Sequence, residues 1–452
     1  MTCEGNTFTV TGVGDAIIAR KLRTFEHDGF REVVALVREA DAAMVNLETL
    51  LHDFEGYPTG VTTGTYMRSP PWVADELSWV GFNLIAAATN HSFDYSHGGM
   101  EATMRELNRR DLAYAGLGRN LADARAPTYV DTPAGRVALV AACSSIRAGS
   151  IAGKQRPDLH GRPGISPLRH TTRYVVPEED IEFVRGLSDN LDLEAIKEHG
   201  ATSSFPYLYP ADPDGGFTLP NVGGGNLTFE PGDEYRVERR VNHDDVAEIT
   251  DRIEEATHQA DWVIATLHAH EGANGRSMIS ESAAFAESFA RACIDAGADA
   301  FLGHGPHVLQ GMEIYEDAPI FHSLGNFVFQ NQLIERLPAE MYERYGIENP
   351  DATPDDVFER REYDEDGCRI GFLENTENWE SVLPLCRFED GNLASIIIHP
   401  IDLMQDETRP RRGRPIVPGS RRGDEILERF SDLSRPYGTS MTVEDGKAHV
   451  EL

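Results

Sequence analysis

Residues 7–48 read TFTVTGVGDAIIARKLRTFEHDGFREVVALVREADAAMVNLE, and their pattern decides the fold class. The apolar run at 7–13 predicts a buried strand that ends just before Asp15. The amphipathic spacing at 29–41 predicts a helix, and the apolar run at 42–47 predicts a second buried strand. A strand, a helix and a strand in this order are typical of α/β layers around a largely buried sheet.

The same alternation continues along much of the chain. We expect further strands at 82–88, 112–115, 136–142, 262–267, 300–302 and 319–323. We expect further helices at 70–81, 98–110, 243–259 and 280–296. Near the C-terminus, the pattern predicts strands at 381–388 and 393–400 and a helix at 424–433.

Two regions break this alternation. Residues 146–243 are rich in Gly, Pro, Asp and Arg, and they include a helical piece at about 178–198. We interpret this region as an insertion into the core, or a lid over the functional site. Residues 331–378 form a second, acidic and irregular insertion. The expected organisation is a core at 1–330 that contains the first insertion, with 379–452 completing the core.

Composition excludes several classes of protein. The chain has 452 residues, 75 acidic and 41 basic, for a net charge of −34. Nucleic-acid binding needs a basic patch, and none is visible in the sequence. No apolar stretch reaches the roughly 18–20 residues of a membrane helix, and the N-terminus lacks the basic and apolar segments of a secretory signal. We therefore expect a cytoplasmic protein without a membrane anchor.

The charged residues and the cysteines each lead to a further expectation, one about the source of the protein and one about disulfides and structural zinc. Abundant carboxylates with only four lysines suggest a halophilic source with a salt-rich cytoplasm, whereas an ordinary acidic enzyme is the alternative. The five cysteines are scattered and have no CxxC spacing, which argues against a disulfide framework and against a structural zinc site.

Polar side chains follow five of the predicted strands, where the loops of α/β folds carry functional groups. They are Asp15; Asn46 and Glu48; Asn90 and His91; His268, His270 and Glu271; and His304 and His307. Each alone is also compatible with a helix cap, a turn or a packed histidine. Together they form the mixture of carboxylate, amide and imidazole that a dinuclear hydrolytic centre needs. The set predicts two divalent metal ions (Mn, Fe or Zn), or a single one.

The order of these motifs carries a specific resemblance. The motifs are Asp15, 46–48, 89–91, Asp94, 115–120, 297–299, 303–310 and 323–327. In this order they resemble the CapA (poly-γ-glutamate capsule biosynthesis) family, a branch of the calcineurin-like metallophosphoesterases. The resemblance covers roughly 7–145 and 244–330. It implies a four-layer α/β/β/α sandwich of the metallo-dependent phosphatase type, here with two insertions.

The resemblance also implies roles for individual residues. The metal ligands would be Asp15, Glu48 as the bridging carboxylate, Asn90, His268, His304 and His307. His91 would protonate the leaving group, and we expect Asp94 to orient that histidine. Asn46, His270, Glu271 and Asn326 would either bind the substrate or support the metal ligands.

The chain departs from the family pattern at three positions. Ile17 replaces the histidine of the Asp-x-His motif of other phosphoesterases of this fold, as is usual for the CapA branch. Gly305 replaces the first histidine of a common His-Pro-His, so either His304 supplies that imidazole or the site lacks a ligand. His270 stands in a His-Ala-His sequence where the family often has His-Trp-Gly, and it could bring a compensating ligand. The number of metal ions therefore stays open.

Two further features have alternative explanations. Arg68, in a loop before a predicted helix, could clamp a phosphate or carboxylate of the substrate, or it could be a surface arginine. The aromatic stretch at 205–209 and the glycines at 223–225 could shape a substrate-facing lid, or they could pack within the first insertion.

The sequence thus leads to two hypotheses. The first is a CapA-type hydrolase in which metal-activated water attacks a phosphoester or amide bond. Because an acidic surface would repel a long polyanion, a small anionic or γ-glutamyl substrate is favoured over the polymer. The alternative is a non-catalytic accessory or binding protein of poly-γ-glutamate capsule biosynthesis, since a fold does not determine a function. An oligomer is compatible with either hypothesis.

Overall fold

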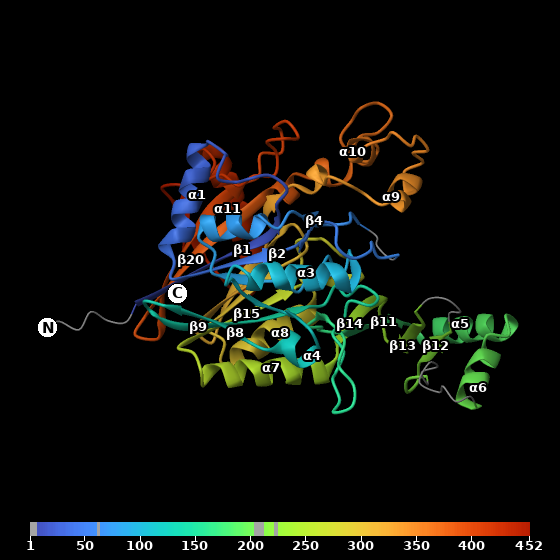
Figure 1. Cartoon of the computed structure of the whole chain (residues 1–452). Coiled ribbons are helices and arrows are strands. Elements are labelled where there is room, and N and C mark those ends of the chain that lie inside the picture. The colour runs from blue at the N-terminus through green and yellow to red at the C-terminus, as the bar shows by residue number, and fades with distance from the viewer. Residues whose placement is uncertain (1–6, 61–63, 203–211, 221–224) are drawn as a thin grey trace.

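The computed structural model describes residues 7–60, 64–202, 212–220 and 225–452 (Figure 1). The stretch 205–209 and residues 223–224, for which a lid was predicted, lie outside these ranges.

A large mixed sheet forms one half of the core. Its strands, in spatial order, are β22 (Met441–Glu444), β23 (Lys447–Val450), β21 (Asn392–Asp402), β20 (Glu380–Glu389), β1 (Thr7–Ile17), β2 (Ala42–Leu47), β5 (Leu84–Ala86) and β6 (Ala113–Ala115), with β19 (Asn326–Phe329) also paired to β1. The strands β1, β2, β5 and β6 are parallel, and β20 pairs antiparallel with β1. The C-terminal strands therefore extend the same sheet that the N-terminal strands begin.

A second sheet faces the first. Its strands, in spatial order, are β17 (Leu309–Tyr315), β18 (Ala318–Leu324), β16 (Ala300–His304), β15 (Trp262–His268), β9 (Gly135–Cys143) and β8 (Thr128–Thr132). The central strands β9, β15, β16 and β18 are parallel. Their carboxyl ends consequently meet at one edge of the sheet.

Helices cover the outer face of each sheet. On the first sheet, α1 (Asp28–Glu39) and α2 (Val73–Val80) bury Phe30 and Leu77 against strand residues such as Val45. On the second sheet, α7 (His243–Thr257) and α8 (Ala284–Asp295) bury their apolar faces against strands β9, β15 and β16. Figure 1 shows α1 above the two sheets and α7 below them.

The apolar core between the sheets completes the layers. It contains Phe8 and Met44 from the first sheet and Leu139 and Ile264 from the second. Helix α11 (Ser420–Ser434) contributes Phe430 to the same core. The four-layer α/β/β/α sandwich expected from the resemblance is therefore confirmed. Strand β2 is buried at every position because it is covered on both faces, which explains its uninterrupted apolar pattern.

Element boundaries differ from the predicted ones for local reasons. The helix predicted at 70–81 begins at Val73, after two prolines that lack a backbone N–H. The helix predicted at 280–296 begins at Ala284. The strands β8, β17, β22 and β23 were not predicted, because short strands at the margins of a sheet carry weak alternation.

The first insertion, at 146–243, has more regular structure than predicted. A small sheet consists of β12 (Phe217–Leu219), β13 (Leu227–Pro231), β11 (His170–Val176) and β14 (Arg236–Val241). The predicted helical piece is split into α5 (Glu178–Asn190) and α6 (Glu194–Thr202). Figure 1 shows α5 and α6 extending away from the core, on the side opposite the N-terminus.

The second insertion is partly helical rather than irregular. It contains α9 (Ala339–Arg344), α10 (Pro354–Glu362) and the short 3-10 turns η3 (Asn331–Leu333), η4 (Gly371–Leu373) and η5 (Thr376–Trp379). Helix α10 begins with a capping box between Thr353 and Asp356 and with a proline in its first turn. Figure 1 places α9 and α10 on the same side of the molecule as α5 and α6.

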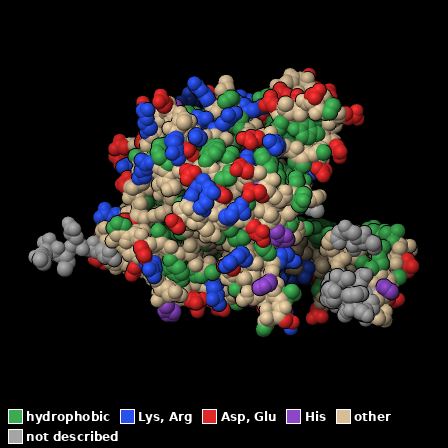
Figure 2. Space-filling view, viewed as in Figure 1, with side chains coloured by type: hydrophobic (Ala, Val, Ile, Leu, Met, Phe, Trp, Pro, Cys, Tyr) green, Lys and Arg blue, Asp and Glu red, His purple; other side chains and the backbone are tan. Residues whose placement is uncertain are grey.

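Several shorter strands and turns and two further helices also belong to the described structure. They are β3 (Leu50–Leu51), β4 (Arg68–Ser69), α3 (Ser96–Asn108), β7 (Leu117–Gly118), α4 (Leu121–Arg125), β10 (Gly164–Ile165) and η2 (Ala273–Gly275). Within the described ranges, none of the helices combines the length and apolarity needed to cross a bilayer. On the face shown in Figure 2, basic side chains are interspersed with acidic ones over the core.

Candidate metal centre

Three polar side chains meet at the end of strand β1. Asp15 is in register with Asn46 on β2 and with Asn326 on β19, and all three residues are fully buried. The Asn46 Nδ2 atom donates a hydrogen bond to Asp15 Oδ1 at 2.7 Å. The parallel arrangement of β1, β2 and β19 therefore brings together residues that are up to 311 positions apart in the sequence, counted from Asp15 to Asn326.

The second sheet contributes two histidines at the matching position. His268 ends β15, His304 ends β16, and the two residues are in register. Thr266 Oγ1 donates to the carbonyl of Leu302 at 2.5 Å and lies 2.8 Å from His304 Nε2. Because the single hydroxyl proton is used by Leu302, the hydroxyl oxygen accepts from His304 Nε2–H. His304 Nδ1 therefore carries the lone pair, and it faces the site.

His268 is oriented in the same way by two amides. Its Nε2 lies 3.1 Å from Asn90 Oδ1, and its Nδ1 lies 3.3 Å from Asn46 Nδ2. The Asn46 Nδ2 atom is an NH₂ nitrogen and can only donate. His268 Nδ1 therefore accepts from it, and His268 Nε2–H donates to Asn90 Oδ1. Two lone pairs, on Nδ1 of His268 and Nδ1 of His304, then face each other at 3.1 Å.

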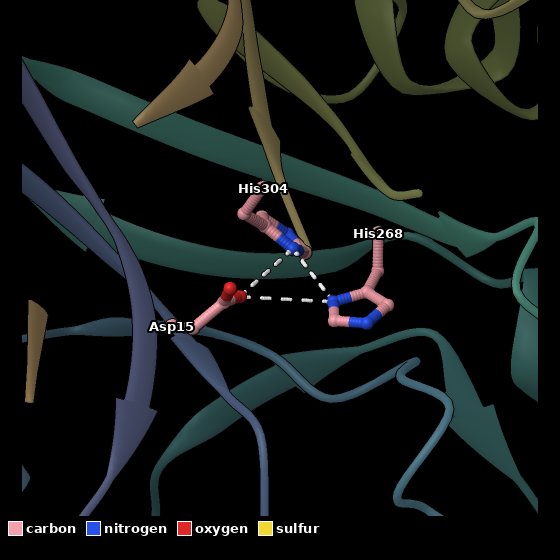
Figure 3. Close-up of side chains that lie close together, drawn as sticks. All are labelled: Asp15, His268 and His304. Carbon is pink, nitrogen blue, oxygen red and sulfur yellow. Dashed lines mark hydrogen bonds and ion pairs between the residues drawn. The ribbon is translucent and has the colours of Figure 1, made fainter. Parts of the chain in front are cut away.

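Asp15, His268 and His304 form the first candidate metal group (Figure 3). Asp15 Oδ1 lies 3.7 Å from Nδ1 of each histidine. Ligand atoms around a tetrahedral zinc ion lie about 3.3 Å apart, given bonds of about 2.0–2.1 Å. The spacing of these three atoms therefore suits ligands that share one cation.

Glu48, His270 and His307 form the second candidate group. Glu48 Oε1 lies 3.7 Å from His307 Nε2 and 3.9 Å from His270 Nε2. It also lies 3.8 Å from His268 Nε2, a residue of the first group. Glu48 thus lies between the two groups, as a bridging carboxylate would.

His307 is held by the amide of Asn326. Asn326 Nδ2 donates to the carbonyls of His307 and Asn378, which leaves Asn326 Oδ1 to accept from His307 Nδ1–H at 2.9 Å. In the neutral ring, the form that binds a metal, His307 Nε2 carries the lone pair and faces Glu48. His307 has a φ of 62°, in the left-handed region that is uncommon for residues other than glycine. Such strain is often found at functional sites.

The buried polar atoms fit divalent cations. Both carboxylate oxygens of Glu48, Oδ2 of Asp15 and Nε2 of His270 have no hydrogen-bond partner. A buried polar group without a partner costs roughly 1–3 kcal/mol, and a buried carboxylate costs more. Coordination to divalent metal ions would satisfy these atoms, and carboxylate with imidazole is a donor set that suits Zn, Mn or Fe.

In the metal-free cluster, the pKa shifts hold two of the candidate histidine ligands neutral and a third charged. Burial raises the pKa of Glu48 well above its usual range, and the charge of Asp15 raises it further. Burial lowers the pKa of His270 to about 3 and that of His304 to about 4. For His307 burial lowers the pKa, but Glu48 and Asp15 outweigh it and raise the value to about 9. The imidazoles of His270 and His304 are thus held neutral at neutral pH, the form in which histidine binds metal.

His91 and Asp94 form a separate pair beside Glu48. His91 Nδ1 lies 2.6 Å from Asp94 Oδ2, which also accepts from the backbone N–H of Met67 at 2.7 Å. Since the carboxylate can only accept, His91 Nδ1–H donates and His91 Nε2 points toward Glu48 Oε1 at 3.9 Å. The pair has the geometry of a histidine whose tautomer is set by a carboxylate.

Other predicted site residues have different surroundings. Asn90 lies at the centre, but its Oδ1 accepts from His268, so its role as a metal ligand stays a prediction. Glu271 points to the hydroxyls of Ser144 and Ser145. His270, expected to contact substrate, lies in the second candidate metal group, as its alternative role of compensating ligand requires.

The structure does not support the predicted role of Arg68 as a clamp on a substrate anion. Its side chain is 4% exposed, and its guanidinium donates to the His52 carbonyl, Asp53 and Glu335. It also lies 4.1 Å over the ring of Phe54. With its donors already used within the protein, the expected clamp on a substrate anion has no support, and Arg68 ties β4 to the second insertion instead.

The structure adds residues that the sequence analysis missed. Thr266 lies two positions before His268 on β15, so both side chains point to the same face, a signal available from strand periodicity. Phe372, from the second insertion, has its ring centroid 5.4 Å from that of His307 and 5.7 Å from that of Phe329. Its approach to the site could not be inferred from local sequence.

Comparison with known proteins identifies the family. Residues 9–331 match the family model described as bacterial capsule synthesis protein PGA_cap. The chain belongs to this family. The resemblance to the CapA family, inferred from the order of the motifs, is thereby confirmed, and the matched range contains both candidate metal groups and the His91–Asp94 pair.

Several proteins are similar over much of their length. An uncharacterized protein, y4sH, of Sinorhizobium fredii (strain NBRC 101917 / NGR234) is 35% identical over 98% of this chain and 93% of its own length. Capsule biosynthesis protein CapA of Bacillus anthracis is 24% identical over 72% of this chain and 61% of its own length. A solved structure of a putative 5'-nucleotidase from Staphylococcus aureus, in complex with alpha-ketoglutarate, has a TM-score of 0.32 and 8% identity, over 70% of this chain and 48% of its own. That structural likeness is too weak to carry an argument.

Proposed function

We propose that this PGA_cap protein is a metal-dependent hydrolase that cleaves a phosphoester or amide bond of a small anionic or γ-glutamyl substrate. The observation that carries the proposal is the position of Glu48. Both of its carboxylate oxygens are buried without a hydrogen-bond partner, and Glu48, itself a member of the second candidate metal group, lies 3.8 Å from His268 of the first. Such an arrangement is costly in a protein unless cations bind there.

Each group has a defined part in this proposal. Asp15, His268 and His304 would hold one divalent cation, and Glu48, His270 and His307 would hold the other. Bound cations of this kind lower the pKa of a water molecule and offset negative charge that develops on the substrate. Asn46, Thr266 and Asn326 fix the direction of the ligand side chains, a role that neighbours of metal ligands commonly have.

His91 supports turnover rather than binding alone. Its Nε2 atom faces the centre, while Asp94 accepts from Nδ1 and stabilises the protonated ring. A histidine in this position can donate a proton from Nε2 to the leaving group.

A second candidate is a non-catalytic role in capsule biosynthesis. It is favoured by the name of the Bacillus anthracis relative, which is described as a capsule biosynthesis protein. In that case the metal groups would serve binding or structure, and substitution at His91 would change neither metal content nor partner binding.

The deciding experiment measures metal content and turnover together. Protein purified without chelator is analysed for Mn, Fe and Zn, and then assayed with phosphomonoester, phosphodiester and γ-glutamyl amide substrates in added Mn²⁺. We expect about two equivalents of metal and turnover that a chelator abolishes. His91→Ala should keep the metal and lose most turnover. Asp15→Ala and His268→Ala should lose both. Metal binding without turnover of any substrate would favour the non-catalytic role.

A further inference from the structure

The loop at 270–278, which we call the His270 loop, carries one member of the second candidate metal group. It closes on itself, because Met278 N–H donates to the His270 carbonyl at 2.8 Å and Gly272 N–H donates to the Arg276 carbonyl at 2.9 Å. Among the described residues, His270 Nε2 has no hydrogen-bond partner. The position of this imidazole therefore depends on what holds the loop.

The core holds the first two residues of the loop. Ser145, which lies just after β9, accepts at Oγ from the His270 backbone N–H at 2.7 Å and donates to the Glu271 carboxylate. Ser144 Oγ also donates to Glu271, at 2.7 Å. The start of the loop is thus fixed to the strand that precedes the first insertion.

The first insertion holds the rest of the loop through Arg239 on β14. Arg239 Nη1 donates to the carbonyls of Gly272 and Arg276, at 3.1 and 3.0 Å. Its Nη2 donates to the Gly275 carbonyl at 2.8 Å. Val237, two residues earlier on the same strand, packs so closely here that an ideal Cβ on Gly275 would lie 2.7 Å from Val237 Cγ1. Strand β14 therefore supports the turn η2 by hydrogen bonds and by packing.

His170, at the start of β11, approaches the same loop from a second strand of the insertion. Its Nε2 lies 3.4 Å from Glu271 Oε1, and its ring centroid lies 5.0 Å from that of Phe285 on α8. Strands β11 and β14 pair antiparallel, with Thr172 opposite Arg239. Two paired strands of the first insertion thus contact the His270 loop.

The first candidate metal group is held by the core instead. Asn46 donates to Asp15, Thr266 accepts from His304, and Asn90 accepts from His268. The contacts of Arg239 and His170 are directed at the loop of the second group.

We propose that Arg239 is a positioning residue for the second cation, so that the first insertion completes that site by holding the His270 loop. This inference rests on the proposed function, since it takes His270 as a metal ligand. Hydrogen bonds from a charged donor are roughly twice as strong as neutral ones, and one guanidinium supplies three of them to this loop. A loop that loses them samples more conformations, and His270 then adopts the metal-binding geometry less often. Loss of such support typically lowers metal affinity about 10–100-fold.

Counting bound Mn²⁺ tests the proposal without relying on turnover. Protein stripped of metal by a chelator is titrated with Mn²⁺, and the free ion is measured by its EPR signal. We expect two classes of site in the wild type, one for each candidate group, and His270→Ala identifies which class belongs to the second group. Arg239→Gln should weaken that class about 10–100-fold and leave the other unchanged.

Two further variants separate positioning from a general effect on the fold. Arg239→Lys keeps a charged donor and should restore part of the affinity of the second site. His170→Leu removes the contact with Glu271 from the other strand and should weaken the same site. In the His270→Ala background, Arg239→Gln should cause no additional loss of Mn²⁺ binding, because the ligand that it positions is absent.

Arg240→Gln is the matched control. It removes the same charge from the next residue of β14, whose side chain pairs with Glu230 and Glu238 within the insertion, and it should leave both classes of site unchanged. If Arg239→Gln weakens both classes equally, or neither, the role of Arg239 is overturned and the proposed function stands. If the wild type binds no Mn²⁺, the proposed function fails, and this inference fails with it.

Discussion

His268 Nδ1 lies 3.1 Å from His304 Nδ1, and the hydrogen bonds of both rings leave a lone pair on each of these atoms. Two acceptors at this distance repel each other unless a cation or a proton lies between them. The relationship depends on Thr266, Asn46 and Asn90, which fix the two tautomers. Substituting one of these three residues, none of which is in either candidate metal group, should therefore change metal binding.

The first prediction concerns Thr266. Thr266→Val keeps the shape of the side chain but removes the oxygen that accepts from His304 Nε2–H. Metal affinity should fall by about 10–100-fold, because the ligand ring loses its orientation. Competition with a chromophoric chelator measures the affinity. Thr250→Val, on helix α7 where the hydroxyl contacts its own helix, is the control and should bind metal as the wild type does.

The second prediction concerns Glu48. Glu48→Gln removes a buried carboxyl group whose two oxygens have no hydrogen-bond partner, so the metal-free variant should be at least as stable to heat as the metal-free wild type. With Mn²⁺ the order should reverse, because the wild type gains the binding free energy of the metal. Thermal unfolding is recorded with chelator and with Mn²⁺. An equal metal-induced rise in Tm for both proteins would rule out Glu48 as a ligand.

The third prediction concerns Asp94. Asp94 Oδ2 accepts from both the Met67 N–H and the His91 Nδ1–H, so Asp94→Asn can keep an oxygen at this position but loses the negative charge that stabilises the protonated His91 ring. The kcat should fall about 10²–10⁴-fold, the range attributed to general acid catalysis, with metal content unchanged. Loss of metal in this variant would instead show that Asp94 supports the centre as a whole.

The fourth prediction concerns pH and stability. His52 is fully buried, both of its ring nitrogens have no hydrogen-bond partner, and its ring centroid lies 4.6 Å from that of Tyr95. Burial, assisted by the charge of Arg68, lowers its pKa from 6.5 to about 4. Between these values the unfolded chain binds the proton more readily, so the free energy of unfolding falls as the pH drops from about 6.5 to 4.

His52→Leu isolates this contribution. Each pKa unit corresponds to about 1.4 kcal/mol, so the wild type should lose up to roughly 3 kcal/mol more than the variant across this range. Chemical denaturation at several pH values measures the difference. His399, whose pKa burial also lowers to about 4, is present in both proteins and cancels. Parallel pH profiles for the two proteins would refute the prediction.

Much of the fold could be predicted from the sequence because a buried strand is visible there as a run of apolar residues. Strands covered on both faces, such as β2 and β15, read as unbroken apolar runs. Polar residues directly after such runs were identified as site candidates, and Asp15, Glu48, His268, His304 and His307 do converge in the structure.

Other features depended on contacts between distant segments. Arg68 looks like an anion clamp in its loop, but Glu335, 267 residues away, occupies its guanidinium. The insertion at 146–243 looks irregular because its strands are short and because β11 pairs with β13 and β14, which lie about 50 or more residues further along the chain.

The sequence by itself determined the α/β layers, the family and most of the candidate metal ligands, because periodicity and motif order are properties of the chain alone. Only the tertiary structure decided how those side chains divide into two groups around Glu48, and which nitrogen of each histidine faces the centre. Those features depend on the register between strands and on hydrogen bonds across the sheets, where residues far apart in sequence come within a few ångströms of each other.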